Sequence, residues 1–455
     1  MNIICSSVTL AMILLAGTQT SVAAEATTEI SPGGIEYVRL YIPDTEDVAI
    51  QIAWPDDWVM REGVNQAVAD LGADLIFAGG AEGFPPGEVS EVHADLNAQA
   101  TVWLTSDHLH AEIITPKDNL EEAVESTAAH LSAPSMDAAW FERVRQGNIS
   151  TMAEEISVPI NRGYEAMRWI ILGDTPLRRA LSGDEPEMYS MAKREEVLEW
   201  HRTTVVRSGA EIVIAGAIEA DVAGKTVDTL FARLPEGKPV APITPKADFA
   251  PRRILLHVPE AQTSTLEFFG PLPPTRMGGE FEDVLLVSML GGDDNSVLFD
   301  AVRTGLRASY GFGAGIDGYT RELRFLFLAG EVETGKLAEA ETIVRAAYAE
   351  FLKAPQLGDL AARKVPLATN IEQNMKDPIT ASWALLMGLL DGQDPDATLR
   401  FSALLEEVTD ATLHSRASSA FPSAEDLIVL AVSPDATALP DACVIKTPAE
   451  AVKCR

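Results

Sequence analysis

The chain has 455 residues, enough for two or more domains with cores of their own. Hydrophobic residues make up 47% and charged residues 23%, as in an ordinary globular protein. Acidic side chains outnumber basic ones by 68 to 35, so the formal net charge is −33 and the surface should repel nucleic acids and anionic membranes. A solvated acidic surface is the simplest explanation of this charge, although such a surface would also attract basic peptides.

The N-terminus carries the pattern of a secretory signal peptide. A short apolar run, VTLAMILLAG at residues 8–17, is followed by small residues up to Ala24. The run is too short to cross a membrane, and Thr18 stands where a lipid-anchored protein would need a cysteine. We therefore expect residues 1–24 to be removed and the mature protein to be periplasmic or secreted.

Residues 25–233 form the first expected domain, which begins with two strand-like runs, GIEYVRLYI and VAIQIAW. The segment VADLGADLIFAGG then predicts a helix that ends at a Gly-Gly pair. Asp70 and Asp74 lie one helical turn apart in this segment, where like charges cost a helix about 0.2–0.5 kcal/mol. The two carboxylates could be metal ligands, an acid/base pair or the remains of a lost site.

A second candidate site lies in the segment SDHLH. Strand alternation places His108 and His110 on one face and Asp107 on the other. A His-x-His pattern can bind a metal, but we favour an ordinary strand of the sheet. The chain has no Gly-x-Ser-x-Gly elbow, no P-loop and no dinucleotide-binding fingerprint.

Residues 234–253 are expected to form an extended linker, because they include five prolines and little apolar periodicity. Beyond them, residues 254–455 repeat the plan of the first domain, with strand-like runs, a helix ending at Gly-Gly, an alternating strand and an amphipathic helix. Hairpin signals dominate over regular βαβ alternation. The sequence thus predicts an α+β fold of two similar, duplicated domains, each a largely antiparallel sheet covered by helices.

Two cysteines remain once Cys5 has left with the signal peptide, and both lie near the C-terminus. The spacing of Cys443 and Cys454 is not that of a zinc finger. A disulfide that holds the tail is the favoured interpretation, and two free thiols are the alternative. A closed loop of this size would contribute about 2–3 kcal/mol to stability.

The second domain contains LGGDDNSVLFDAVRTGLRASYGFGAGIDGYTRELRFLFLAGEVETGKLAEA, residues 290–340. Its Leu-Gly-Gly stop, Ser-x-Leu helix start, Val-Arg pair, later tyrosine and β-hairpin resemble the C-terminal domain of the insulinase/pitrilysin peptidases, also called inverzincins. The resemblance extends over nearly the whole mature chain through the order of its elements. It implies that the two domains form one half of a clamshell.

In that family a His-x-x-Glu-His helix and a later glutamate bind zinc and activate a water molecule. The resemblance places Asp70 and Asp74 at the two histidine positions and Ala73 at the position of the motif glutamate. The third-ligand position falls at about Thr151. The nearest glutamates to it are Glu154 and Glu155. The motif is therefore degenerate, and we expect no metal or other cofactor in this chain.

Family members pair such a zinc domain with a partner that supplies an arginine and a tyrosine to the backbone of the bound peptide. The matching residues here are Arg303 and Tyr310, which are close to two helical turns apart. Both point to one side if their helix, capped near Asn295 or Ser296, extends nearly to the tyrosine. Guanidinium and hydroxyl donors suit carbonyl oxygens. Without the resemblance, the pair would be a surface arginine and a tyrosine at the edge of the core.

The resemblance favours a non-catalytic, substrate-binding subunit of an exported heterodimeric zinc peptidase that cuts unfolded peptides. The partners would be a homologous chain with an intact His-x-x-Glu-His motif, which brings the zinc, and the peptide. One alternative is a peptide-binding or scaffold protein with no catalytic partner. Another is a peptidase that acts alone through a different site, which the lack of a nucleophile or metal cluster in the sequence disfavours.

Overall fold

The computed structural model describes residues 24–183, 185–241, 243–307, 311–355 and 360–454. The expected signal peptide, apart from Ala24, lies outside the described residues, and so does Tyr310. Among the described residues, no helix combines the length and the apolarity needed to span a bilayer.

The first half of the chain builds a six-stranded sheet in the order β1-β2-β6-β3-β5-β4. Its strands are β1 (Glu25–Ile30), β2 (Glu36–Tyr41), β3 (Asp47–Pro55), β4 (Gln99–Leu104), β5 (His108–Pro116) and β6 (Glu211–Gly216). Strands β2 and β6 pair in parallel, and the other neighbours pair antiparallel. The long central strand β3 alternates between two buried faces, which explains its nearly continuous apolar sequence.

The second half builds a six-stranded sheet in the order β12-β7-β11-β8-β10-β9. Its strands are β7 (Arg253–His257), β8 (Ser264–Leu272), β9 (Phe312–Thr320), β10 (Leu323–Val332), β11 (Ile428–Ser433) and β12 (Cys443–Ile445). Five strands repeat the first sheet in order and direction, which confirms the predicted α+β duplication. The sixth differs, because β12 pairs in parallel with β7 whereas β1 pairs antiparallel with β2.

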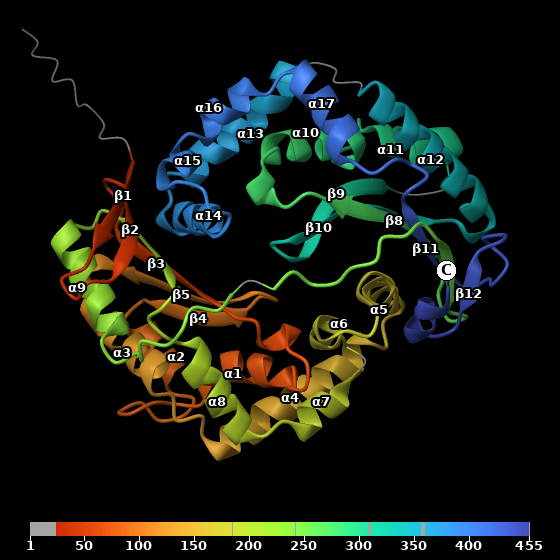
Figure 1. Cartoon of the computed structure of the whole chain (residues 1–455). Coiled ribbons are helices and arrows are strands. Elements are labelled where there is room, and N and C mark those ends of the chain that lie inside the picture. Colours follow the sequence, from red (N-terminus) through yellow and green to blue (C-terminus); the bar gives the residue numbers. More distant parts are fainter. Residues whose placement is uncertain (1–23, 184, 242, 308–310, 356–359, 455) are drawn as a thin grey trace, which may run out of the picture.

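Helices surround both sheets (Figure 1). Those of the first half are α1 (Ala67–Ala78), α2 (Val89–Asp95), α3 (Leu120–Ser132), α4 (Ala138–Glu155), α5 (Pro159–Leu172), α6 (Pro176–Leu181), α7 (Pro186–Met191), α8 (Arg194–Thr204) and α9 (Ala220–Phe231). Those of the second half are α10 (Glu280–Gly291), α11 (Val297–Phe299), α12 (Leu337–Lys353), α13 (Leu360–Asn374), α14 (Pro378–Leu390), α15 (Pro395–Leu399), α16 (Phe401–Glu407) and α17 (Asp410–Ala420). A π-helical segment, η4 (Asp300–Leu306), continues α11.

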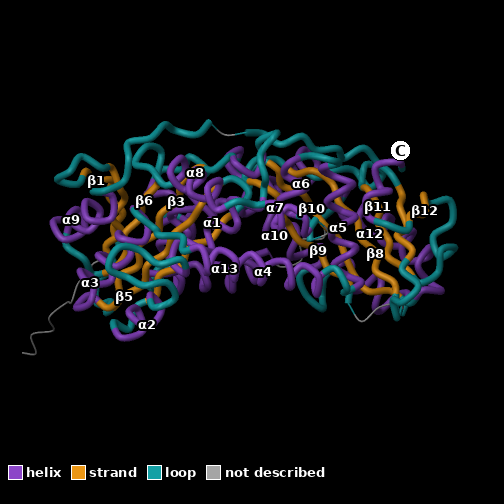
Figure 2. The backbone as a smooth tube through the Cα atoms, turned by 90° about the horizontal axis from the view of Figure 1, so that it is seen from below, coloured by secondary structure: helices purple, strands orange, loops and turns teal. Residues whose placement is uncertain are grey.

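One helix of each half packs against the sheet of the other half. Helix α14 of the second half packs on β3 and β6 of the first sheet, where Leu385 and Leu386 join Leu40 in one buried cluster. Helix α5 of the first half packs in the same way on β11 and on the 3-10 segment η6 (Pro448–Lys453). Figure 2 shows the two halves side by side along the long axis of the molecule. Each sheet is therefore covered on one face by its own helices and partly covered on the other by a helix of the other half.

A disulfide joins Cys443 of β12 to Cys454, which follows η6. Cys454 is buried, and η6 lies against α5 of the first half. The bond therefore closes the C-terminal tail at the place where the two halves meet.

Candidate functional site

Helix α1 presents Asp70 and Asp74 on the side that faces α4. Its opposite side is held in the core by Val68, Leu71 and Leu75, all fully buried. Asn148 of α4 bridges the two aspartates: its Nδ2 donates to Oδ2 of Asp70 at 3.3 Å and to Oδ2 of Asp74 at 3.0 Å. The predicted pair thus lies together, held by an amide from a helix more than seventy residues away.

Tyr189 of α7 completes this cluster. Its hydroxyl donates to the same Oδ2 of Asp70 at 2.5 Å. Burial raises the pKa of Asp70 even though the donors from Tyr189 and Asn148 oppose the change. Partial removal of water by the surrounding protein atoms raises the pKa of Asp74 to about 6, although its side chain still reaches solvent. The raised pKa of Asp74 leaves a minor part of its population protonated near neutral pH, which lowers its repulsion with Asp70.

Beyond its two carboxylates, the cluster as oriented presents neither a further metal ligand nor a further proton acceptor. The amide turns its nitrogen, not its oxygen, toward the carboxylates, and a nitrogen that donates hydrogen bonds cannot ligate a metal. Ala73, between the aspartates, offers no proton acceptor. No three His, Cys, Asp or Glu side chains of the described residues are grouped so that they could hold a metal ion. Asn148, one helical turn before the expected third-ligand position near Thr151, is an α4 residue that donates to the pair.

A cavity of about 410 Å³ opens beside the cluster. Asp70 and Tyr189 line it from the first half, together with Ser106 in the turn between β4 and β5. Tyr319 of β9 lines it from the second half. The cluster of Asp70, Asp74, Asn148 and Tyr189 therefore borders a space that both halves enclose.

Arg303 lies on η4, directly after α11. The helix is capped at Ser296, one of the two predicted positions, and Leu298 and Val302 are buried beneath it. The side chain of Arg303 is exposed to solvent, and its guanidinium carbon lies 5.4 Å from the centre of the Phe299 ring. Arg303 therefore lies on the solvent-facing side of a helix whose other side is packed.

The helix that carries Arg303 ends at Leu306, and Arg307 follows in the left-handed region with φ of 54°. Tyr310 comes after this end and lies outside the described residues. The helix of Arg303 therefore does not continue to the tyrosine. Helical spacing alone required such a continuous helix to place both residues on one side.

The His-x-His strand holds the two halves together. His110 packs between the rings of Trp103 and, from α14, Trp383, at centroid distances of 5.3 and 5.4 Å. Burial lowers the pKa of His110 to about 4, so its imidazole is neutral at physiological pH. Asp107 accepts from the backbone N–H of Arg321 in the second half at 2.8 Å, and its other oxygen lies 3.0 Å from Nδ1 of His108. These contacts fit the favoured interpretation of an ordinary sheet strand.

The two six-stranded sheets and the exchanged helices define the class of fold: a duplicated, two-domain α+β chain. Residues 192–364 match the family model described as the peptidase M16 inactive domain. This segment runs from the end of the first half through the sheet of the second half and contains Arg303. This segment covers less than half of the chain, and its similarity to the M16 inactive domain is accompanied by a shared fold over most of the chain.

Solved structures share the fold at low sequence identity. A peptidase M16 inactive domain from Pseudomonas fluorescens is 16% identical, with a TM-score of 0.80 over 90% of this chain and 98% of that one. A protease from Helicobacter pylori is 13% identical, with a TM-score of 0.78 over 91% and 100%. The periplasmic protease PqqL from Escherichia coli is 15% identical, with a TM-score of 0.73 over 95% of this chain but 50% of its own length. No curated protein sequence matches the chain.

Proposed function

We propose that this chain is the non-catalytic, substrate-binding subunit of an exported heterodimeric zinc peptidase that degrades or processes unfolded peptides. A homologous partner with an intact His-x-x-Glu-His motif would bring the zinc. Arg303 and Tyr310 would hold the backbone of the peptide near that metal. The chain would correspond to half of a longer enzyme, in line with its coverage of half of PqqL, which is described as a periplasmic protease.

The exposure of Arg303 is the observation that carries this proposal. The arginine is presented to solvent from a helix that is capped at Ser296 and anchored by buried Leu298. A guanidinium offers planar donors that suit the carbonyl oxygens of an extended peptide. Its placement within the segment that matches the M16 model supports a role in the second half of the chain rather than the first.

The hydrogen-bonded cluster at Asp70 is the second support. Asn148 and Tyr189 donate hydrogen bonds to the two carboxylates. The first half can therefore keep its fold without a metal to bind these oxygens. A subunit that has lost its own chemistry but retains the scaffold would depend on a partner for hydrolysis.

The test is a peptide-cleavage assay on the mixed subunits. Arg303→Ala should lower kcat/KM at least tenfold relative to the wild-type mixture, because one charge-assisted hydrogen bond contributes about 1.5–3 kcal/mol. Arg303→Lys should recover part of the loss, since an ammonium donates but lacks the planar fork. Tyr310→Phe should reduce the rate in the same direction.

Arg202→Ala is the matched control, since Arg202 is an exposed helical arginine of the first half, in α8. This variant should retain the wild-type rate. Full activity of both Arg303→Ala and Tyr310→Phe would exclude the proposed role of the pair, and a mixture no faster than the catalytic partner alone would favour the scaffold alternative.

A further inference from the structure

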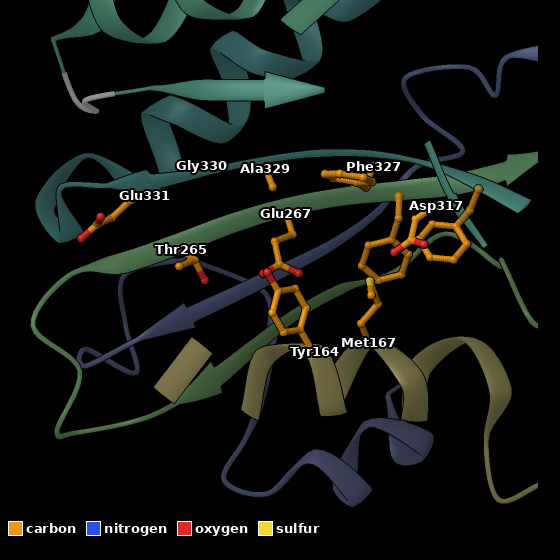
Figure 3. Close-up of a pocket in the computed structure, with 11 residues that line it drawn as sticks. Tyr164, Met167, Thr265, Glu267, Asp317, Phe327, Ala329, Gly330 and Glu331 are labelled. Carbon is orange, nitrogen blue, oxygen red and sulfur yellow. The ribbon is translucent and has the colours of Figure 1, made fainter. Parts of the chain in front are cut away.

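A second cavity, of about 420 Å³, lies between α5 and the sheet of the second half (Figure 3). Tyr164 and Met167 of α5 form one wall. The opposite wall comes from the sheet and includes Glu267 and Phe269 of β8 and Phe327 and Ala329 of β10. The lining is therefore largely apolar and aromatic, with a carboxyl group on its sheet side.

Glu267 is 6% exposed and makes no hydrogen bond or ion pair with any described residue. Its carboxyl group points from β8 into the cavity, toward Tyr164 (Figure 3). Burial alone raises the pKa of Glu267 to about 7. The hydroxyl of Thr265, on the same face of β8, is also buried without a hydrogen-bond partner among the described residues. Buried polar groups are normally paired, so this cavity lacks the group that would pair them.

The first half contains a residue that corresponds to Glu267 and has a hydrogen-bond partner. Gln51 of β3 lies on the face covered by α14, as Glu267 of β8 lies on the face covered by α5. Its cross-strand neighbour is Glu112, to which its Nε2 donates at 2.6 Å. The corresponding neighbour of Glu267 is Ala329, which offers neither a partner nor the volume to close the space. The duplication has therefore opened a site in the second half that is closed in the first.

The charged side chains that line the cavity all have one sign. Asp317 of β9 and Glu331 of β10 join Glu267 in the lining, and the lining contains no Lys, Arg or His among the described residues. Asp317 accepts from the backbone N–H of Gly318 and Glu331 from the hydroxyl of Thr263, so neither is neutralised by a base. Aromatic faces next to carboxylates attract cations through both electrostatics and their quadrupoles.

We infer that this cavity binds an organic cation, an ammonium or guanidinium group on an aliphatic stem, with the charged head at Glu267 and the stem against Met167 and Phe327. The head would be either the basic side chain of a peptide or a free amine. The inference does not rest on the proposed peptidase function, because it concerns the isolated chain and residues remote in sequence from Arg303.

Isothermal titration calorimetry on the full mature chain tests this site with three probes: a blocked tripeptide with a central lysine, the same tripeptide with norleucine, and n-butylammonium. The lysine peptide should bind at least tenfold more tightly than the norleucine peptide. Tighter binding of the lysine peptide than of butylammonium assigns the site to peptide side chains. Equal affinities assign it to free amines.

Two variants locate the binding. Glu267→Gln keeps the shape and removes the charge, and Ala329→Leu fills the space; each should weaken binding of the cations at least tenfold. Glu121→Gln, an exposed carboxylate of α3, makes the same change in net charge outside the cavity and should leave affinity unchanged. Thermal melts verify that each variant is folded. Equal affinity of Glu267→Gln and wild type, equal affinity for the lysine and norleucine peptides, or no cation binding by the wild type would overturn the inference.

Discussion

At the scale of single residues, the surroundings explain why Asp70 and Asp74 are tolerated one turn apart. Asn148 donates to both, and Tyr189 donates to the more buried of the two. The pKa of Asp74, raised to about 6, leaves part of its population neutral near physiological pH. The pair is thus a hydrogen-bonded cluster at the edge of a cavity, and its assignment to a degenerate zinc motif stays a prediction.

The bond from Tyr189 to Asp70 should contribute to stability. Tyr189→Phe removes the hydroxyl donor and leaves a mostly buried carboxyl group with the weaker donor Asn148 at 3.3 Å. We expect the free energy of unfolding to fall by about 1–3 kcal/mol in urea titrations.

Tyr164→Phe is the matched control for this substitution. Tyr164 is 46% exposed, so the loss of its hydroxyl should change stability by less than about 0.5 kcal/mol. A loss of equal size in both variants would show that the hydroxyl of Tyr189 has no special part in the cluster.

The sequence alone identified the two aspartates but not their partners. Asn148 and Tyr189 lie far along the chain from Asp70, on helices whose packing against α1 depends on the tertiary fold. A motif assigns positions within one helix, but it does not show which side chain of a distant helix, here Asn148, will contact them. The sequence analysis also missed Glu267, because an isolated acidic residue in a strand carries no sequence pattern.

Glu267 should make stability depend on pH. Its pKa in the folded state is raised from 4.5 to about 7 by burial, so the native state binds the proton more tightly than the unfolded chain does. Stability must then fall as the pH rises from about 4.5 to about 7. Glu267→Gln cannot ionise and escapes this loss.

The corresponding measurement is the difference in unfolding free energy between Glu267→Gln and wild type at pH 5 and at pH 8. The variant should gain relative to wild type at the higher pH, by up to about 3 kcal/mol for a shift of this size. Asp74 and the other acids titrate in both proteins and cancel in the comparison. The same difference at both values of pH would contradict the assigned burial of Glu267.

At the scale of elements, the sequence predicted the segments with a clear apolar periodicity but not the edge strands of the sheets. The strand predicted around His108 and His110 and the helix before the second Gly-Gly pair agree with β5 and α10. The edge strands β1 and β12 have short or polar sequences, and their pairing comes from a sheet edge supplied by distant residues. The π-helical turn at Arg303 also has no periodic signal in the sequence.

Gly72 shows how packing overrides helix propensity within α1. A Cβ at this position would lie 2.2 Å from the ring of Trp200, which is fully buried and donates to Asp56. Alanine is the better helix former, yet Gly72→Ala should destabilise the protein by about 1–3 kcal/mol because the indole must move.

Gly147→Ala in α4 is the control for this effect. Nothing lies within 4 Å of a Cβ at this exposed helical position. The substitution should stabilise the protein by about 0.5–1 kcal/mol in the same urea titrations. Changes of the same sign in both variants would show that the contact with Trp200 does not set the requirement for Gly72.

At the scale of the whole molecule, the exchange of α5 and α14 binds the two halves into one unit. Leu385 of α14 is buried against the first sheet, and η6 near the disulfide is buried against α5. Separation of the halves would expose one face of each sheet to water. Unfolding should therefore be cooperative across the linker despite the two-domain plan.

Cleavage of the linker tests this cooperativity. A protease site inserted between Lys246 and Ala247, both exposed, allows the chain to be cut after folding. The fragments should coelute in size-exclusion chromatography and melt in one transition, because the contacts between the halves survive the cut. Fragments that separate in native buffer, or that melt in two transitions, would show that the exchanged helices do not hold the halves together.

The central claim is that this chain contributes substrate binding to a reaction that a zinc-bearing partner performs. The most direct measurement is the rate of cleavage of an unfolded peptide by the purified partner, with and without this chain. We predict no cleavage by this chain alone, acceleration when it is added, and loss of that acceleration with Arg303→Ala. Cleavage by this chain alone at the rate of the mixture, or acceleration that Arg303→Ala leaves unchanged, would contradict the claim.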